Sequence, residues 1–132
     1  MILIIGAFLG FISVAFGAFA EHALRESVTD EHFRFLMTAI RYNQVNAVII
    51  VAIGLATLTG SELGKITALR WSGILFIIGT LLFSFSIYIS VSFEIPFLTN
   101  LTPVGGITMM VAWLLLIISG FVARSLLLRR DD

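Results

Sequence analysis

Four long stretches without a charged residue constrain this chain more than any other feature of its sequence. They run from Met1 to Ala20, Tyr42 to Ser61, Trp71 to Phe93 and Ile95 to Ala123, and contain 20, 20, 23 and 29 residues. About 20 helical residues, at about 1.5 Å each, cross a hydrocarbon core about 30 Å thick, so each stretch is long enough to span a membrane. Runs such as Trp113 to Ile118 do not alternate, which argues against a membrane barrel. The sequence therefore predicts an all-α membrane protein with four transmembrane helices.

The composition excludes several classes of protein. Hydrophobic residues make up 59% of the 132 residues and charged residues only 12%, too few to cover the surface of a soluble domain. The net charge is zero and no basic run exceeds two residues, so we expect no nucleic-acid partner. The absence of cysteine removes disulfides and thiolate metal sites.

The last stretch is longer than one span needs, and its two prolines account for the excess. Pro96 suits a loop, and Thr102-Pro103 is typical of a helix N-cap followed by the first helical residue. We therefore expect one transmembrane domain over residues 1–132, with spans at about 1–20, 42–60, 71–93 and 103–123.

The first stretch admits a second interpretation, because Ala18-Phe19-Ala20 has the small-x-small form of a signal-peptide cleavage site. Cleavage would leave three spans. No Lys or Arg precedes the apolar region, and the region is longer than a usual signal core, which favours its retention as a span.

Lysine and arginine counts predict the orientation. One side of the membrane receives Lys65, Arg70, Arg124, Arg129 and Arg130; the other receives Arg25, Arg34 and Arg41. Five against three favours cytoplasmic termini for a multi-pass protein.

An amphipathic segment precedes the second span. Phe33, Leu36, Met37 and Ile40 recur at helical spacing, and Ser27 to Asp30 offers an N-terminal cap. We expect this helix to continue into the second span and to pack on the others, with a position in the membrane interface as the alternative.

Small residues follow one face of the first and last spans. Because lipid gives helices no hydrophobic drive to associate, close backbone approach at such faces supports packing. The predicted helix-packing residues are Gly6, Gly10, Ser13, Gly17, Gly105, Ala112 and Ser119.

Polar residues inside the spans fall into two groups. Tyr42, Asn43 and Asn46 project to one side of a helix at the mouth of the second span, with Gln44 nearly opposite. In the third span a row of hydroxyls recurs every four residues, at Thr80, Ser84, Tyr88 and Ser92. Both groups suit hydrogen bonds within and between helices, and the lining of a polar cavity is the alternative.

Catalytic and metal chemistry have little support. His22 and His32 each follow a glutamate, but adjacent residues on a helix point in different directions, so each pair offers one ligand where zinc needs three or four. Glu94 stands alone at the edge of the third span, and no catalytic or nucleotide-binding motif is present. We expect no metal, no cofactor and no enzymatic activity.

Three sequence blocks resemble those of the YgdD/YwdK-type small membrane proteins, the family of domain of unknown function 423. The blocks are Gly17 to Leu24, Tyr42 to Ala47, and Thr102 to Gly106 with Trp113 beyond. The first block has Ala20-Glu21 before its histidine where the family usually has Gly-Ala, and the second has asparagines where the family has a histidine. The Pro-x-Gly-Gly block is intact.

The resemblance implies a four-helix protein of the bacterial cell (inner) membrane and carries no established activity. A shared family site would use residues toward one outer side of the membrane: His22, Tyr42, Asn43, Asn46, Pro103, Gly105 and Gly106.

Three functional hypotheses follow. The first is a structural or accessory protein that packs against itself or another membrane protein, with membrane lipids around it. The second is a protein that binds or transports a lipid, a small molecule or an ion through the outer polar cluster. The third, an enzyme acting on a membrane lipid, rests only on His22 and nearby carboxylates.

Overall fold

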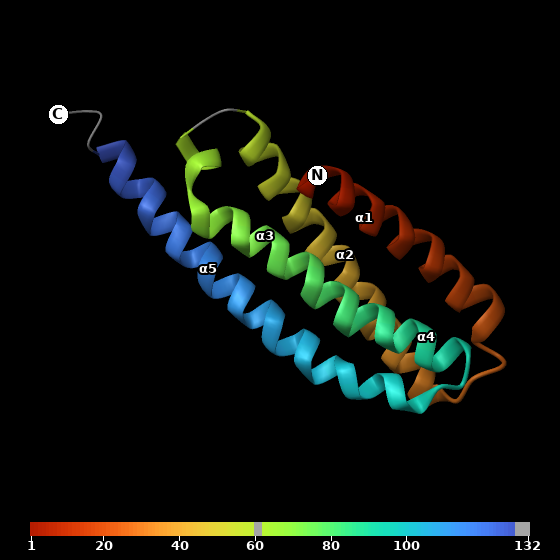
Figure 1. Ribbon diagram of the computed structural model, residues 1–132. Helices are drawn as coiled ribbons and strands as arrows, with labels where there is room; N and C mark the ends of the chain where they lie inside the picture. Colours follow the sequence, from red (N-terminus) through yellow and green to blue (C-terminus); the bar gives the residue numbers. More distant parts are fainter. Residues whose placement is uncertain (60–61, 129–132) are drawn as a thin grey trace.

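The computed structural model describes residues 1–59 and 62–128, and every described element is helical (Figure 1). Gly60 of the second predicted span, and Arg129 and Arg130 of the charge count, lie outside the described residues. The elements in chain order are α1 (Ile2–Phe19), the π turn η1 (Ala20–Leu24), α2 (Asp30–Leu58), the 3₁₀ turn η2 (Glu62–Lys65), α3 (Thr67–Thr80), the π turn η3 (Leu81–Phe85), α4 (Ser86–Ser92), the 3₁₀ turn η4 (Pro96–Leu101) and α5 (Thr102–Leu128).

Four helical rods of the described chain are long and apolar enough to cross a membrane: Ile2–Leu24, Asp30–Leu58, Thr67–Ser92 and Pro96–Leu126. In the third rod α3 and α4 continue one another through η3 (Figure 1). The rods lie side by side in one elongated bundle (Figure 1). The predicted fold class, an all-α protein with four transmembrane helices, is confirmed.

Helix α2 begins well before the second uncharged stretch. Thr29 is its N-cap, and the Thr29 hydroxyl oxygen accepts a hydrogen bond from the His32 backbone N–H at 3.2 Å. From there α2 runs without a break to Leu58, so the predicted amphipathic segment and the second span form one helix, as expected. Leu36 and Ile40 of that segment are buried, which places its apolar face in the core.

The helices pack as two close pairs, α1 with α2 and α3 with α5, and α2 joins the pairs through α3. One apolar cluster, with Leu9, Ile50 and Phe76, fills the half of the bundle nearer the N-terminus. A second cluster, with Leu36 and Tyr88, fills the other half.

Small residues stand where backbones approach most closely. A Cβ added at Gly6 would lie 2.8 Å from Ile50 Cγ2, and one added at Gly105 would lie 2.5 Å from the Phe83 backbone nitrogen. The remaining predicted packing residues lie along the same faces: Ser13, Ala112 and Ser119 are buried, and Gly10 and Gly17 are half-buried.

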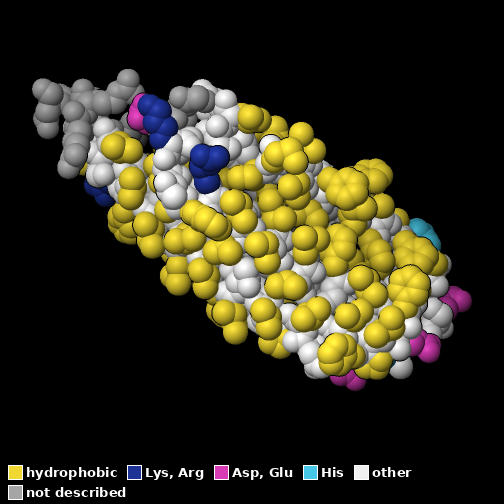
Figure 2. Space-filling model, viewed as in Figure 1, with side chains coloured by type: hydrophobic (Ala, Val, Ile, Leu, Met, Phe, Trp, Pro, Cys, Tyr) yellow, Lys and Arg dark blue, Asp and Glu magenta, His cyan; other side chains and the backbone are white. Residues whose placement is uncertain are grey.

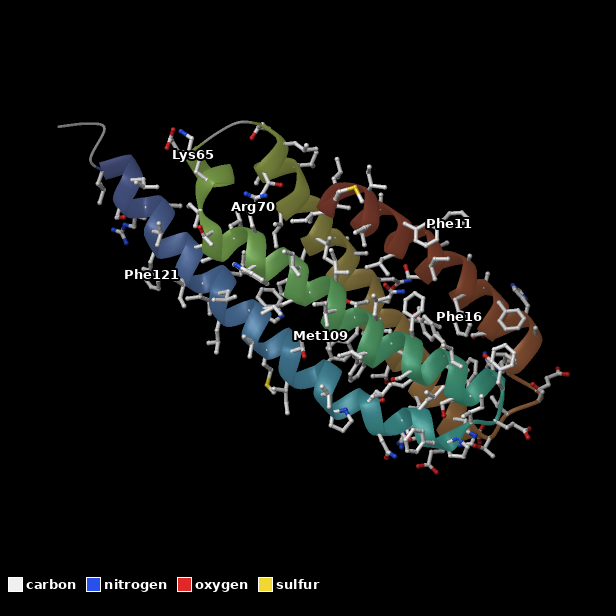
Figure 3. All side chains as sticks on the ribbon, viewed as in Figure 1. Phe11, Phe16, Lys65, Arg70, Met109 and Phe121 are labelled. Atoms are coloured by element: carbon white, nitrogen blue, oxygen red, sulfur yellow. The ribbon has the colours of Figure 1, made fainter. Side chains whose placement is uncertain are left out.

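The outer surface has an apolar middle and polar ends. On the face shown in Figure 2, hydrophobic side chains cover the middle, lysine and arginine lie with an acidic side chain at one end, and further acidic residues and a histidine lie at the other. Lys65 lies at the first of these ends, beside the start of α3 (Figure 3). Phe121, 70% exposed, and Phe11, 69% exposed, contribute to the apolar belt (Figure 3). Such a belt is the surface expected in contact with lipid.

Candidate functional site

The two asparagines of the predicted outer cluster lie inside the bundle. Asn43 and Asn46 are 0% and 2% exposed. They sit 13 and 16 residues into α2, which is about 20 Å or more from the start of the helix at about 1.5 Å per residue. They therefore lie well inside helix α2, which begins at Asp30 rather than near Tyr42, and they face its buried side.

Asn46 connects three helices. Its side-chain amide donates to the Thr80 hydroxyl of α3 at 2.9 Å and to the Met109 sulfur of α5 at 2.8 Å. Figure 3 places Met109 on α5, where it faces α3. Thr80 donates in turn to the Phe76 backbone carbonyl at 2.7 Å. Protein groups thus accept both hydrogen bonds that the buried Asn46 amide nitrogen donates, which suits a structural role.

Asn43 makes a weaker contact. Its amide nitrogen donates to the Tyr88 hydroxyl at 3.3 Å, while its carbonyl oxygen Oδ1 is buried and has no hydrogen-bond partner among the described residues. The Tyr88 ring is held by stacking on Phe16, with 4.0 Å between ring centroids. The pair therefore lies in a packed interior with one acceptor unused.

The first two hydroxyls of the row in the third span donate hydrogen bonds to backbone carbonyls, as the structural interpretation predicts. Thr80 bonds within its own helix, and Ser84 donates across to the Ala39 carbonyl of α2 at 2.8 Å. Tyr88 accepts from Asn43. Ser92 Oγ is buried and unpartnered within the described chain.

The other predicted site residues differ from these asparagines in their exposure. His22 is exposed in η1, and Tyr42 is 46% exposed with its ring 4.9 Å from that of Phe83. Pro103 is exposed in the first turn of α5. Gly105 is buried against backbone, whereas an added Cβ at Gly106 would meet nothing within 4 Å. Phe83 packs against both the Tyr42 ring and the backbone at Gly105, so the structure brings these two residues and the two asparagines to the third rod, whereas His22 is exposed in η1.

A different polar site lies at the acidic end of the bundle. A cavity of about 660 Å³, here called the outer cavity, opens between the segment before α2, the start of α2, α4 and η4. Its volume falls within the range of about 300–1,000 Å³ typical of small-molecule sites. Polar side chains line much of it: Ser27, Thr29, His32, Ser90, Glu94 and Thr99.

Glu94 holds an uncommon backbone conformation beside this cavity. Its φ of 54° is the one positive value at a non-glycine residue in the described chain. The backbone N–H of Ile95 donates to the Ser90 carbonyl at 3.0 Å, so Glu94 stands where a helix-ending motif usually has glycine. A side chain kept in a position that favours glycine is a candidate for a function of that side chain.

A second concave surface runs between α1 and α2. Two adjoining hollows of about 450 and 420 Å³ share Val14 and Gln44 in their walls, and we call them together the α1–α2 groove. Small residues of α1, namely Gly6, Ala7, Gly10, Ser13, Gly17 and Ala18, form one side of it. Gln44 is exposed and has no hydrogen-bond partner among the residues that the structure describes.

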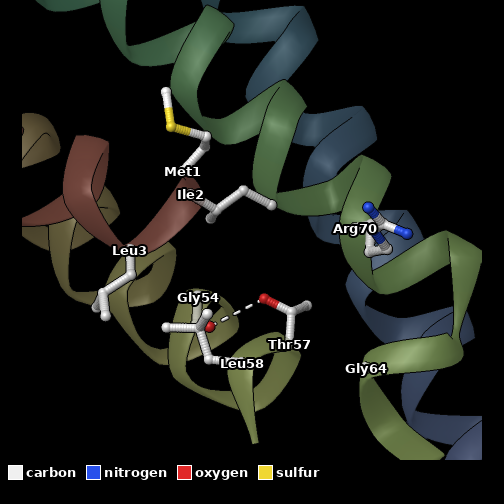
Figure 4. Close-up of a pocket in the computed structure, with 8 residues that line it drawn as sticks. All are labelled: Met1, Ile2, Leu3, Gly54, Thr57, Leu58, Gly64 and Arg70. Carbon is white, nitrogen blue, oxygen red and sulfur yellow. Dashed lines mark hydrogen bonds between the residues drawn. The ribbon is translucent and has the colours of Figure 1, made fainter. Parts of the chain in front are cut away.

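A third hollow of about 380 Å³ lies at the basic end, between the start of α1, the end of α2 and Gly64 (Figure 4). Arg70 borders it, and the Thr57 hydroxyl is already bonded to the Gly54 carbonyl at 2.9 Å. Among the described residues of its lining, Arg70 has the one charged side chain and Thr57 the one hydroxyl.

The sequence places Glu94 alone at the edge of the third span and Gln44 nearly opposite Asn46, and neither residue is among the predicted site residues. A signal for Gln44 was present, because a residue opposite the buried Asn46 on one helix must face away from the core. No comparable signal marked the outer cavity, since Ser27 to His32 and Ser90 to Thr99 are separated by a long stretch of chain. Among the described residues there is no group of three or more potential metal ligands.

Comparison with known proteins identifies relatives along nearly the whole chain. The family model described as "Protein of unknown function (DUF423)" matches residues 16–106. The UPF0382 membrane protein SH2409 of Staphylococcus haemolyticus is 32% identical over 121 residues, covering 92% of this chain and 95% of the relative. YwdK of Bacillus subtilis is 27% identical, covering 89% and 93%. The inner membrane protein YgdD of Escherichia coli is 28% identical, covering 88% and 86%. No solved structure matches.

Proposed function

Because the chain belongs to the DUF423 family of membrane proteins, whose function is unknown, we propose a role from its own surface: a non-catalytic, structural or accessory membrane protein that assembles with a second copy through the α1–α2 groove. The observation that carries this proposal is the exposed amide of Gln44 in a groove of small residues. The bacterial cell membrane is its location, with the basic end and both termini toward the cytoplasm.

Gln44 stands between the apolar part of the groove and the hollow that Glu21 and Arg41 also line. It shares the groove wall with Ser13 and Val14, which are six or more residues inside the uncharged stretch that ends at Ala20. An amide that faces hydrocarbon without a partner is costly, so such a side chain favours an arrangement that pairs it. A neighbouring protein surface that offers both a donor and an acceptor meets this need.

A second copy of the chain meets it without any further residue. An amide carries both a donor and an acceptor, so two Gln44 side chains related by a two-fold axis form reciprocal hydrogen bonds. The groove also has a matching ridge, because Val48, 70% exposed, stands one turn from Gln44 at its rim. Small residues on α1 let this ridge approach closely.

The absence of cysteine allows a direct test by cross-linking of single-cysteine variants. In membranes treated with a short thiol-reactive cross-linker, we expect Val48→Cys to give a dimer. The matched control is Ile117→Cys, a 54% exposed position on α5 outside the groove, which should stay monomeric. Equal cross-linking at both positions indicates random collision and contradicts the proposed interface.

Replacing the amide tests its contribution. Gln44→Leu is expected to weaken dimerisation about tenfold, because interhelical amide hydrogen bonds contribute roughly 1–2 kcal/mol in model membrane peptides. The measurement is a dilution series in lipid with a fluorescence-transfer readout. Unchanged dimerisation of Gln44→Leu, a monomer at all lipid dilutions, or a stoichiometric complex with a different protein would each overturn the proposal.

A further inference from the structure

We propose that the outer cavity binds an amphiphilic organic amine, with the Glu94 carboxylate as the group that receives its ammonium. The cavity lies outside the α1–α2 groove, so this inference does not depend on the proposed dimer. Its support comes from the lining of the cavity, the backbone at Glu94 and the charge of this end of the molecule.

The lining combines one carboxylate with apolar walls. Glu94 is the one acidic residue that lines the cavity, while Phe35, Ile87 and Val91 supply hydrocarbon surface. Hydroxyls of Thr29 and Ser90 add neutral acceptors. A ligand with a cationic head and an apolar body matches this lining, because its ammonium would face the carboxylate and its hydrocarbon would face the apolar side chains.

The conformation of Glu94 points to the same carboxylate. Glycine adopts a φ of 54° without strain, so glutamate at this position costs stability that glycine would avoid. The chain keeps glutamate there, at the rim of a cavity large enough for a small molecule. A functional use of the carboxylate accounts for this cost.

The charge of this end favours a cation over an anion. Five acidic residues lie in or beside the connections at this end, namely Glu21, Glu26, Asp30, Glu31 and Glu94. The basic residues of this side are Arg25, Arg34 and Arg41, so the carboxylates outnumber the guanidinium groups by five to three, and one of the guanidinium groups, that of Arg25, is paired with Glu21. The remaining carboxylates attract positive solutes to the mouth of the cavity.

An organic ammonium suits the site better than a metal ion. Glu94 and His32 are the only residues of the carboxylate and imidazole types in the lining, and metal sites of these ligands need three or more. The volume of about 660 Å³ also exceeds what one ion fills. The ammonium has two natural sources, a soluble amine and an aminophospholipid headgroup, which share this chemistry.

The first experiment measures binding of phenethylamine to the full chain in non-ionic micelles by calorimetry. Phenethyl alcohol, which has the same ring without the charge, is the ligand control. We expect phenethylamine to bind, and Glu94→Gln to weaken binding about tenfold or more, because the charge-assisted hydrogen bond is lost. Glu31→Gln removes an exposed carboxylate that does not line the cavity and should change affinity less than about twofold.

Glu94→Gly separates binding from folding. Relief of the positive φ should raise the melting temperature by a few degrees while phenethylamine binding is lost. If Glu94→Gln is destabilised, Glu94→Gly therefore still tests whether the carboxylate binds the amine. Equal affinity of wild type and Glu94→Gly, equal affinity for amine and alcohol, or no binding of any amine would overturn the proposal.

The source of the ammonium is distinguished by native mass spectrometry with added short-chain lipids. Selective retention of dioctanoyl-phosphatidylethanolamine over dioctanoyl-phosphatidylglycerol, in wild type and not in Glu94→Gly, supports the proposal with a lipid as the ligand. Phenethylamine binding without such selectivity supports it with a soluble amine.

Discussion

Replacement of Gly105 by alanine is expected to lower the free energy of unfolding by about 3 kcal/mol, at the upper end of typical overpacking costs. The added Cβ would lie 2.5 Å from the Phe83 nitrogen and 2.9 Å from the Gly79 carbonyl oxygen. Both are backbone atoms of the third rod, so a side-chain rotation does not relieve the contact. Helix α5 must move away from α3 and η3, which loosens the packing around Met109 and Ala112.

The neighbouring residue provides a matched control. An added Cβ at Gly106 meets nothing within 4 Å, so Gly106→Ala should be neutral or stabilise the helix by about 0.5–1 kcal/mol through the propensity of alanine. Reversible unfolding in mixed micelles, followed by circular dichroism, measures both variants. Equal stability of the two alanine variants would show that α5 does not approach the third rod as closely as the structure has it.

These two glycines also show which features of the fold can be predicted from the sequence. The spacing of charges predicts four spans, and the period of Phe33, Leu36 and Ile40 predicts that the segment before the second span is helical. The seven-residue spacing of Gly105, Ala112 and Ser119 selects Gly105 rather than Gly106 for packing, but it does not indicate which side of the bundle this face turns to. That side depends on where η3 and α3 lie, which is a long-range property of the fold.

For the polar residues, too, the sequence predicts some features, and others depend on the long-range fold. The facing of Asn43 and Asn46 to one side of α2 is predictable from helical geometry, as is the opposite direction of Gln44. Their distance from the end of the helix depends on where α2 begins, and the charged residues before Tyr42 do not mark that start, because α2 continues through them from Asp30. The outer cavity depends on a turn in which Glu94 has a positive φ. The sequence does not indicate this turn, because a positive φ is expected at glycine rather than at glutamate.

Replacement of Asn46 by aspartate tests the buried polar contacts, with an expected loss of about 3 kcal/mol. The two side chains have nearly the same shape. The substitution therefore adds a negative charge and replaces the amide donor with an oxygen that accepts hydrogen bonds. At this site the new oxygen would face the Thr80 hydroxyl and the Met109 sulfur. The Thr80 hydrogen is already donated to the Phe76 carbonyl, and the sulfur has no hydrogen to donate. The carboxylate is then buried without a donor.

Two comparison variants separate charge from packing. Asn43→Asp places a carboxylate opposite the Tyr88 hydroxyl, which is free to rotate and donate, so its cost should be smaller than that of Asn46→Asp. Asn46→Leu removes the amide without adding charge and should cost about 1 kcal/mol or less, as interhelical hydrogen bonds in membranes typically do. The expected order of unfolding free energies places Asn46→Asp lowest. If Asn46→Asp and Asn46→Leu are equally stable, water reaches this position, and the asparagines line an open polar path rather than join the helices.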